Sequence, residues 1–329
     1  MDRIDRRRFL GATAGAAAYL GTASGVRADD LAGQANAKSP APEAPAAPVA
    51  HDSGERPPAP PMVELGKTGV KMSRLGQGTG VKGGERQSDQ TRMGFEKIVK
   101  LMHHAYDRGV RFFDLADLYG THVYFREALK GMERDKLAIL TKMWWRYDGP
   151  EDKTNAPERR QFARSTLERF RHEIDTDYLD IVLLHCLTKP GWDEHMQPYM
   201  EVLNEEKEKG RVRAVGCSCH DLRALKTAAV TPWVDVILAR INMKGGKEVM
   251  MDGSREEVES VLRTAKENGK AILGMKIFGE GRLADQRDAC MKYAQELGLL
   301  DAMTIGFHTP EQIDEVLHLM AKYPAKMVA

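Results

Sequence analysis

Four side chains that could carry out acid–base chemistry each follow a short apolar run in this sequence. Asp114 and Tyr119 lie in the stretch FFDLADLYG, Lys142 follows AILT, and His185 follows DIVLL. A strand that enters a packed core normally ends in turn residues, so an acid and a phenol at its exit indicate either a reactive site or a capped turn. The two interpretations differ in whether all four side chains meet.

An acid, a phenol, an ammonium and an imidazole in one cavity could donate a proton to a carbonyl oxygen. The pKa of a free tyrosine is about 10, and a neighbouring ammonium such as Lys142 would lower it by favouring the phenolate. Asp114 would keep Lys142 charged, and His185 could hydrogen-bond a substrate oxygen beside Tyr119. Taken singly, each residue has an ordinary structural interpretation: a turn cap, a core ring, a solvated chain end or a core histidine.

Strand and helix patterns alternate along the sequence and could bring these residues together. Two short alternating runs around Thr68-Gly69 predict a β-hairpin, and a buried strand follows that ends near Gly78. The further predicted strands span 110–116, 136–142, 177–185, 212–218, 233–241, 270–276 and 301–307. The predicted helices span 92–109, 157–174, 195–210, 221–229, 254–269, 285–298 and 309–323.

About eight strand–helix units over roughly 250 residues predict an α/β fold of the (β/α)8 TIM-barrel class, with the β-hairpin at its N-terminus. A doubly wound open sheet is the competing architecture. No GxGxxG follows the first strand, and the polar candidates recur at the carboxyl ends of many strands, which favours the barrel. In a barrel, all four candidates would face one rim.

Length and composition suit one large globular domain or two ordinary ones, and the strand–helix pattern places a single domain over residues 62–329. The chain has 329 residues, of which 42% are hydrophobic, and a formal net charge of +1. That charge gives no reason to expect nucleic acid as a partner. The four cysteines, at positions 186, 217, 219 and 290, are too few and too unevenly spaced for a disulfide scaffold.

The first 28 residues have the pattern of a secretory signal. Arg6–Arg8 precede a run of small and apolar residues over 9–26, and Val-Arg-Ala offers a cleavage site at Ala28. This resembles a twin-arginine export signal, which implies the export machinery as a partner and a periplasmic location. A short membrane anchor and a disordered basic leader are the alternatives, but the run is rich in Ala, Gly and Thr and would span a membrane poorly. Residues 29–61 are an Ala/Pro-rich linker.

Several motifs, in order along the chain, resemble the aldo-keto reductase family. They are LGKTGVKMSRLGQGT, GVRFFDLADLYG, LTK, DYLDIVLLH and VGCS, and the resemblance covers the whole folded part. It implies a TIM barrel that moves hydride between a nicotinamide cofactor, usually NADPH, and a small-molecule carbonyl or alcohol. It also implies a catalytic tetrad in which Tyr119 is the general acid, Lys142 with Asp114 tunes it, and His185 orients the carbonyl. Asp117 is then expected to be a turn residue.

The same resemblance implies a site for NADP or NAD, with departures from the family pattern. The implied cofactor-binding residues are Thr79, Ser218, Cys219, Met275, Lys276, Phe278, Gly279, Gly281, Gly306, Gln312 and Glu315. Cys219 stands where the family usually has asparagine and Leu238 where it has glutamine, so two contacts to the nicotinamide amide are missing. Met275 replaces a tyrosine that commonly stacks under the nicotinamide. Uncharged Gly306 and Gln312 replace the usual basic residues, which leaves the choice between NADPH and NADH open.

The pocket for the substrate is less defined by the sequence. Trp144 matches a family position that lines this pocket, although Trp144 and Trp145 are equally well interpreted as two rings that pack a loop onto the barrel. Segments 82–91 and 146–156 are expected to shape the pocket. Lys276 and Arg282 could meet a pyrophosphate, although a plain strand-to-helix turn is an equally good interpretation of this glycine-rich segment.

Two other functions remain open. His185-Cys186 and the motif CSCH over 217–220 could bind a soft metal, although no CxxC pair anchors them and the favoured interpretation assigns no metal. A non-catalytic binding scaffold is the other alternative. Export adds a requirement, because a periplasm is not expected to supply reduced nicotinamide: a cofactor carried inside the folded protein would need recycling, by a second substrate or a redox partner.

Overall fold

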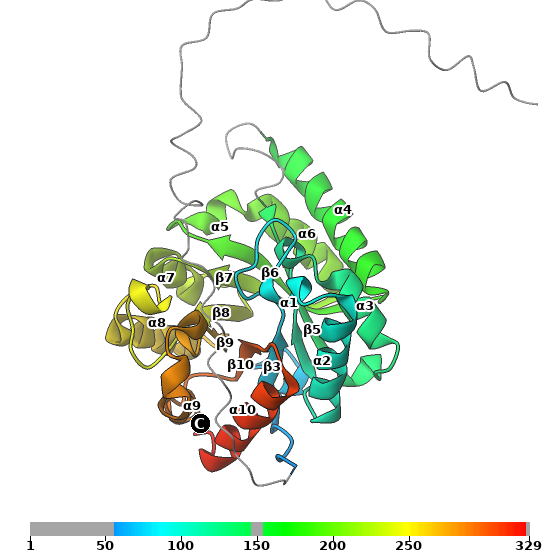
Figure 1. Cartoon of the computed structure of the whole chain (residues 1–329). Helices are drawn as coiled ribbons and strands as arrows, with labels where there is room; N and C mark the ends of the chain where they lie inside the picture. The colour runs from blue at the N-terminus through cyan, green and yellow to red at the C-terminus, as the bar shows by residue number, and fades with distance from the viewer. Residues whose placement is uncertain (1–55, 146–153, 327–329) are drawn as a thin grey trace, which may run out of the picture. The chain divides into compact units, whose positions relative to one another are not determined.

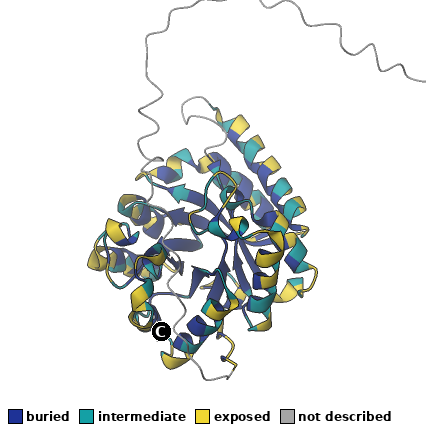
Figure 2. Ribbon diagram, viewed as in Figure 1, coloured by how far each residue is buried: buried dark blue, intermediate teal, exposed yellow. Residues whose placement is uncertain are grey.

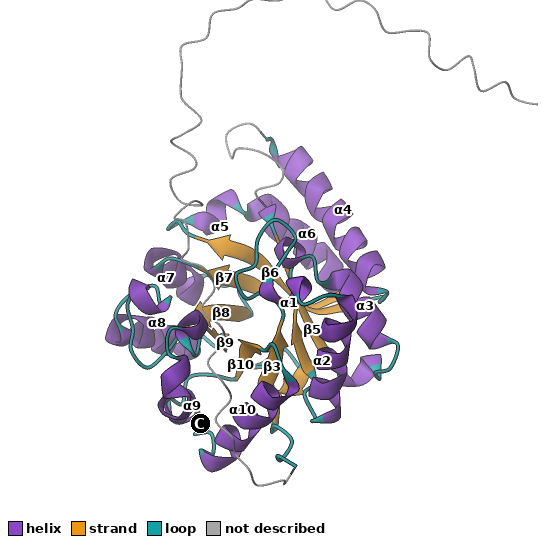
Figure 3. Ribbon diagram, in the orientation of Figure 1, coloured by secondary structure: helices purple, strands orange, loops and turns teal. Residues whose placement is uncertain are grey.

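The structure, a computed structural model, describes residues 56–145 and 154–326, all of which belong to one unit, Ala46–Ala329. Within these residues, eight parallel strands close into a barrel in the order β10-β3-β4-β5-β6-β7-β8-β9 (Figure 1). Helices surround the strands on the outside of the barrel (Figure 3). The predicted (β/α)8 barrel with an N-terminal hairpin is confirmed.

Most elements fall close to the predicted ranges. The strands are β1 Met62–Glu64, β2 Lys71–Ser73, β3 Leu75–Gly78, β4 Phe112–Asp114, β5 Ala138–Met143, β6 Leu179–Leu187, β7 Val212–Cys219, β8 Val236–Arg240, β9 Ala271–Met275 and β10 Ala302–Gly306. The α-helices are α1 Asp89–Arg92, α2 Phe95–Asp107, α3 His122–Leu129, α4 Ala156–Ile174, α5 Trp192–His195, α6 Gln197–Glu208, α7 Leu222–Val230, α8 Arg255–Glu267, α9 Arg287–Glu296 and α10 Pro310–Lys322. Short 3-10 helices are η3 Asp117–Tyr119, η4 Arg134–Lys136, η6 Lys247–Val249, η7 Gly279–Gly281 and η8 Ala284–Gln286.

Three short helices were not predicted, and one of them is the four-residue α1, which lies mostly in the segment 82–91 that was expected to be a loop. Helix α3 was not predicted, because it is only 8 residues long and its buried apolar residues, Phe125 and Ala128, are too few to show a helical period. The predicted helix 195–210 corresponds to α6, and the short α5 that precedes it was not predicted. Pro198 lies in the first turn of α6, a position where proline costs no helical hydrogen bond.

Side chains along each strand alternate between the barrel interior and the helix layer. In β6, Ile181 and Leu183 pack in the inner cluster, whereas Val182 and Leu184 pack in the outer cluster against the helices. Figure 2 shows buried strands and helices that are exposed mainly on their outward sides. A polar residue at the carboxyl end of a strand therefore faces the inside of the barrel only if its position in the alternation points inward.

The N-terminal hairpin lies at the opposite end of the barrel. Strands β1 and β2 pair antiparallel, with Val63 opposite Met72. Leu65 and Met72 are fully buried and belong to the inner cluster together with Ala271, the first residue of β9. Apolar side chains thus fill the amino-terminal mouth, and reactive groups are left to the other rim.

Residues 1–55, 146–153 and 327–329 lie outside the described residues. They include the predicted signal sequence, 1–28, the linker as far as residue 55, and 146–153 of the segment expected to shape the pocket. Residues 56–61, the end of the predicted linker, are described and form no regular element. A search of the described helices finds none with the length and apolar character needed to cross a membrane.

Candidate active site

The four predicted catalytic side chains lie together at the carboxyl-terminal rim. Asp114 ends β4, Tyr119 ends η3, and Lys142 and His185 come from β5 and β6. The Tyr119 hydroxyl lies 3.4 Å from Nε2 of His185. Nζ of Lys142 donates to Oδ1 of Asp114 and, at 2.9 Å, to the carbonyl of Leu115. The same Nζ lies 4.8 Å from the centroid of the Tyr119 ring, so the four groups form one connected set.

Burial decides the protonation of these groups. It raises the pKa of Tyr119 well above the ordinary value, and the negative charge of Asp114 raises it further. The lowering of this pKa expected from Lys142 is therefore not seen, and the phenol keeps its proton at neutral pH. Burial, with the charge of Lys142, lowers the pKa of His185 well below its ordinary value, so the imidazole is neutral. Burial also lowers the pKa of Lys142, although the charge of Asp114 opposes this.

His185 has an unused hydrogen-bonding atom. A neutral imidazole has one donor and one acceptor nitrogen. Its Nε2 faces Tyr119, whereas Nδ1 is buried and has no hydrogen-bond partner in the described part of the chain. The ring centroids of Tyr119 and Trp144 lie 5.5 Å and 5.8 Å from that of His185. Trp144 is therefore beside the predicted catalytic imidazole, where a pocket wall was expected.

A buried ion pair holds the turn that carries Tyr119. The side chain of Asp117 is fully buried, and its two oxygens accept hydrogen bonds of 3.0 Å and 2.9 Å from Arg169 of α4. Arg86 lies 3.2 Å from the same carboxylate, and both arginines also contact Glu173. Asp117 is thus a structural turn residue, whereas its neighbour Asp114 faces the reactive groups.

The loop after β3 packs its backbone directly onto the Tyr119 ring. A Cβ added at Gly80 would lie 2.2 Å from two carbons of the ring, and one added at Gly83 would lie 2.4 Å from another. A larger residue at either position would have to displace the ring. The prediction missed these two glycines, although the run GTGVKGGE directly after the first strand was a signal for close backbone approach.

Of the predicted nicotinamide contacts, the structure brings Ser218 and Met275 to the inner side of the rim but not Cys219. Ser218 is fully buried and its Oγ accepts a 3.0 Å hydrogen bond from the N–H of Cys186. Met275 ends β9 and packs in the inner cluster. Cys219 lies in the outer core, where its sulfur is 3.8 Å from that of Cys217. Neighbouring strand residues face opposite sides, which separates Cys219 from Ser218.

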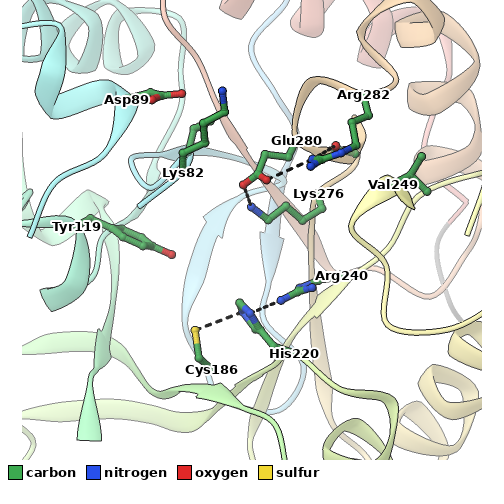
Figure 4. A network of polar contacts seen from close by, with 12 residues as sticks. Lys82, Asp89, Tyr119, Cys186, His220, Arg240, Val249, Lys276, Glu280 and Arg282 are labelled. Carbon is green, nitrogen blue, oxygen red and sulfur yellow. Dashed lines mark hydrogen bonds and ion pairs between the residues drawn. The ribbon is translucent and has the colours of Figure 1, made fainter. Parts of the chain in front are cut away.

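The predicted pyrophosphate residues form a charged turn. Lys276 pairs with Glu280, and Arg282 lies 3.4 Å from the other oxygen of the same carboxylate (Figure 4). Gly279 and Gly281 have positive φ angles of 56° and 93°, a backbone conformation that favours glycine. Gly279 is buried and Gly281 is exposed, and the two cations on one carboxylate leave a net positive charge, which suits a diphosphate group.

The residues predicted to contact the adenosine half of the cofactor carry less charge than the turn of Lys276 and Arg282. Gln312 accepts a 2.8 Å hydrogen bond from the N–H of His308, and Glu315 pairs with Arg287 at 2.8 Å. Burial lowers the pKa of His308, so its imidazole is neutral at pH 7. Gly306, at the end of β10, offers only backbone. None of Gly306, Gln312 and His308 therefore supplies the cation that a 2′-phosphate prefers.

The last two predicted cofactor residues, Thr79 and Phe278, pack beside the tetrad and the outer core. Thr79 is fully buried and donates to the carbonyl of Asp114 at 2.8 Å, while Phe278 packs against the outer core. A nicotinamide dinucleotide fits this rim in its diphosphate and nicotinamide parts. The hydroxyl of Ser218 can still donate a hydrogen bond to a ligand. Nδ1 of His185 is a second polar atom at this rim, buried and without a hydrogen-bond partner among the described residues.

A polar chain beside the tetrad was not predicted as such. Nε2 of His220 lies 3.6 Å from the sulfur of Cys186, and Nη2 of Arg240 contacts Nδ1 of His220 (Figure 4). Arg240 also pairs with Asp252 at 3.4 Å. The prediction considered Cys186 and His220 only as metal ligands and omitted Arg240. Its position two residues after Leu238 on one strand was the available signal, because such residues share a face.

The Cys/His motif considered for a metal is divided in the structure. Cys217 and Cys219 belong to the outer core, while Cys186 and His220 contact each other near the rim. Across residues 56–145 and 154–326, no group of three or more His, Cys, Asp or Glu side chains is placed to hold a metal ion.

Sequence comparisons relate this chain to a known protein family. The profile of a family described as "Aldo/keto reductase family" matches residues 74–329. "Probable aldo-keto reductase 1" of Glycine max is 30% identical over 165 residues, which cover 47% of this chain and 44% of that protein. "NADH-specific methylglyoxal reductase" of Escherichia coli is 26% identical over 196 residues, 55% of this chain and 59% of that protein. These alignments span about half the length of the relatives.

Solved structures share the fold. An aldo-keto reductase from Bacillus halodurans in its holo form superposes with a TM-score of 0.62 at 16% identity, over 80% of this chain and 91% of that one. A Bombyx mori aldo-keto reductase in complex with NADP has a TM-score of 0.58 at 16% identity, over 79% of this chain and 88% of that one. At such identities the likeness concerns the barrel alone.

Proposed function

Since this chain belongs to the aldo/keto reductase family, we propose that it is an oxidoreductase that reduces an aldehyde or ketone, or oxidises the corresponding alcohol, with NADH or NADPH. The observation that carries the proposal is the 3.4 Å approach of the Tyr119 hydroxyl to Nε2 of His185, beside the ion pair of Lys142 with Asp114. A bound nicotinamide would supply or accept the hydride.

In this proposal the protein donates the proton and stabilises the phenolate that proton transfer leaves behind. Tyr119 donates the proton to the carbonyl oxygen, because burial keeps the phenol protonated until the substrate needs it. Neutral His185 hydrogen-bonds the same oxygen through Nε2. The ammonium of Lys142, 4.8 Å from the ring centroid, stabilises the phenolate as it forms, so its charge acts during the reaction.

Each part of the cofactor would meet residues of a different kind. Ser218 and Met275 would contact the nicotinamide, and Lys276 and Arg282 the diphosphate. The uncharged adenosine end supports use of NADH at least as readily as NADPH. The name of the Escherichia coli relative, an NADH-specific reductase, agrees with this part of the proposal.

The test of this function is a parallel fluorescence titration of the purified protein with NADH and NADPH, which follows quenching of Trp144 and Trp145. A panel of aldehydes and ketones is then assayed with whichever nucleotide binds, and metal content is measured on the same sample. Saturable binding and turnover by metal-free protein are expected. Protein that binds neither nucleotide would contradict the proposal and return the Cys/His metal site or a non-catalytic scaffold to consideration.

We further propose that residues 1–28 direct export to the periplasm by the twin-arginine route, with a redox partner or a second substrate to recycle the cofactor. The support is the sequence pattern of Arg6–Arg8 followed by a weakly apolar run. Replacement of Arg6, Arg7 and Arg8 by lysine should keep the protein in the cytoplasm of a bacterial host. Export that continues in this variant would contradict the route.

A further inference from the structure

A thiol, an imidazole and a guanidinium form a chain beside the proposed proton donor. The sulfur of Cys186 lies 3.6 Å from Nε2 of His220, whose Nδ1 is contacted by Arg240. Figure 4 shows the phenol of Tyr119 directed toward this chain. The ring centroids of His185 and His220 lie 6.4 Å apart, so the chain lies directly beside the tetrad.

Arg240 determines which ring nitrogen of His220 carries the proton. A guanidinium has donors and no acceptor, so Nδ1 of His220 must accept from Arg240. Burial and the charge of Arg240 lower the pKa of His220 well below its ordinary value, so the ring carries a single proton. That proton is on Nε2, the atom that faces Cys186. An N–H directed at sulfur stabilises a thiolate over a thiol.

The sulfur also lies within the electrostatic field of the tetrad. A negative charge on Cys186 raises the pKa of both Tyr119 and Lys142. Among the described residues, the charged groups beside this chain include Lys142 paired with Asp114, Arg240 paired with Asp252, and Lys276 paired with Glu280, whose other oxygen also contacts Arg282. These four cations exceed the three carboxylates by one before a negative charge on Cys186 is counted.

The backbone departs from regular strand geometry at this residue. Cys186 has a φ of +59°, and the pairing of β6 with β7 shifts register between Leu184 and Leu187. A left-handed φ is uncommon for a residue other than glycine, and a bulge re-aims a side chain. Regular alternation after inward-facing His185 would send Cys186 to the helix layer, as it does Leu184. The irregularity places the sulfur against His220 instead, and such outliers cluster at functional sites.

We propose that Cys186 is a thiolate nucleophile toward the carbonyl carbon of an aldehyde held by Tyr119 and His185, and that the protein oxidises aldehydes to carboxylic acids as well as reducing carbonyls. The inference rests on the proposed function for its hydride acceptor, the oxidised nicotinamide.

The steps balance with groups already described. The sulfur lone pair forms a C–S bond as the C=O π bond opens, and the oxygen takes the proton of Tyr119, which gives a hemithioacetal. The hemithioacetal carbon loses its hydride to the oxidised nicotinamide while the hydroxyl proton returns to Tyr119, which leaves a thioester. Water then cleaves the C–S bond, and the sulfur keeps the electron pair. The sum converts aldehyde, water and oxidised nucleotide to carboxylic acid, reduced nucleotide and one proton.

The first experiment needs no nucleotide. The full chain is alkylated with iodoacetamide across a pH series, and labelling of Cys186 is followed by peptide mass spectrometry. Half-maximal labelling is expected well below the free-thiol value of about 8.5, with a rate at pH 7 that falls about tenfold in His220→Ala and recovers in part in His220→Gln, which restores an N–H donor. Cys290 is the internal control, because burial raises its pKa to about 11. An ordinary thiol profile, or one indifferent to His220→Ala, would overturn the thiolate.

The second experiment tests the chemistry. The full chain is incubated with benzaldehyde and NAD⁺ or NADP⁺ and quenched in acid, and then the acyl group on Cys186 and the benzoic acid formed are measured. Both should be lost in Cys186→Ser and kept in Cys290→Ser. Reduction of benzaldehyde by the wild type in a parallel assay with NADH or NADPH, with no acyl group or acid formed from the oxidised nucleotides, overturns this inference alone, and acid formation unaffected by Cys186→Ser does the same. Protein that neither reduces nor oxidises any tested carbonyl overturns both this inference and the proposed function.

Discussion

The Tyr119 hydroxyl and Nε2 of His185 lie 3.4 Å apart, although the residues are 66 positions apart in the sequence. That separation is longer than a strong hydrogen bond, which leaves both atoms available to a third oxygen between or beside them. Because the phenol is protonated and the imidazole neutral, the pair can both donate a proton and orient its acceptor.

Removal of the phenol oxygen should abolish most carbonyl reduction. Tyr119→Phe is expected to lower kcat by about 10²–10⁴-fold, the usual contribution of a general acid, while the fold and nucleotide binding stay intact. Steady-state kinetics and the tryptophan titration measure the two effects separately. Tyr106→Phe is the control, since that hydroxyl lies away from the tetrad and accepts a 3.3 Å hydrogen bond from the N–H of Glu133. Equal activity in the two variants would remove Tyr119 from the mechanism.

Loss of the buried ammonium should affect both stability and activity. Lys142→Met leaves Asp114 buried without its cation, which typically costs about 3–5 kcal/mol. Urea unfolding measures this loss. The double variant Asp114→Asn with Lys142→Met should regain part of the stability but none of the activity, because nothing then stabilises the phenolate. Recovery of activity in the double variant would mean that the charge of Lys142 has no catalytic role.

The close packing on the Tyr119 ring gives a prediction with a matched control in one loop. Gly80→Ala places a methyl group 2.2 Å from ring carbons and should lower kcat by moving the hydroxyl. Gly84→Ala places its methyl group where no atom lies within 4 Å and should leave kcat unchanged. Crystal structures or kinetics of the two variants test this. A fully active Gly80→Ala would show that the ring position tolerates displacement.

The ion-pair network behind Tyr119 makes stability depend on pH in a defined window. Burial alone would raise the pKa of Glu173, but hydrogen bonds from His122 and Arg169 lower it to about 2. Since the folded pKa lies below the unfolded value of about 4.3, Glu173 stabilises the fold by roughly 2–3 kcal/mol above pH 4.3, and this stabilisation is lost as the pH falls toward 2.

Denaturant unfolding of the wild type and Glu173→Gln between pH 7 and pH 2 measures this effect. The difference in unfolding free energy between the two proteins should be constant from pH 7 to about 5 and then shrink. Glu168→Gln, an exposed position on the same helix, is the control and should change little at any pH. A difference that stays constant down to pH 2 would contradict the role of the ionised carboxylate.

The adenosine end predicts cofactor preference. The wild type should bind NADPH no more tightly than NADH, because Gly306 and Gln312 carry no charge. Gln312→Arg should tighten NADPH binding by about tenfold, the worth of one charge-assisted hydrogen bond, and leave NADH nearly unaffected. Gln312→Ala controls for the lost hydrogen bond to the N–H of His308. Strong NADPH preference in the wild type would show that another cation meets the 2′-phosphate.

The barrel and the tetrad could be predicted from the sequence because both depend on local pattern. Asp114, Lys142 and His185 each follow an apolar run, and alternation of strands and helices forces such residues to one rim. The outward position of Cys219 was also predictable, since it is the strand neighbour of Ser218. Alternation alone assigns the two residues to opposite faces.

The polar chain and the protonation states could not be predicted in this way. The direction of Cys186 depends on a bulge and a left-handed backbone angle, which a period-two pattern does not contain. The pKa of Tyr119 depends on how deeply its phenol is buried, and the neighbouring charges alone gave the wrong direction. Both properties come from tertiary packing.

The hairpin that fills the amino-terminal mouth also constrains kinetics. With Leu65 and Met72 packed into that end of the described barrel, small molecules must approach Tyr119 from the carboxyl-terminal rim. A nucleotide and a carbonyl compound that share one entrance obstruct each other if the smaller one arrives first. Binding should therefore be ordered, nucleotide first and carbonyl compound second, and the product alcohol should leave before the spent nucleotide.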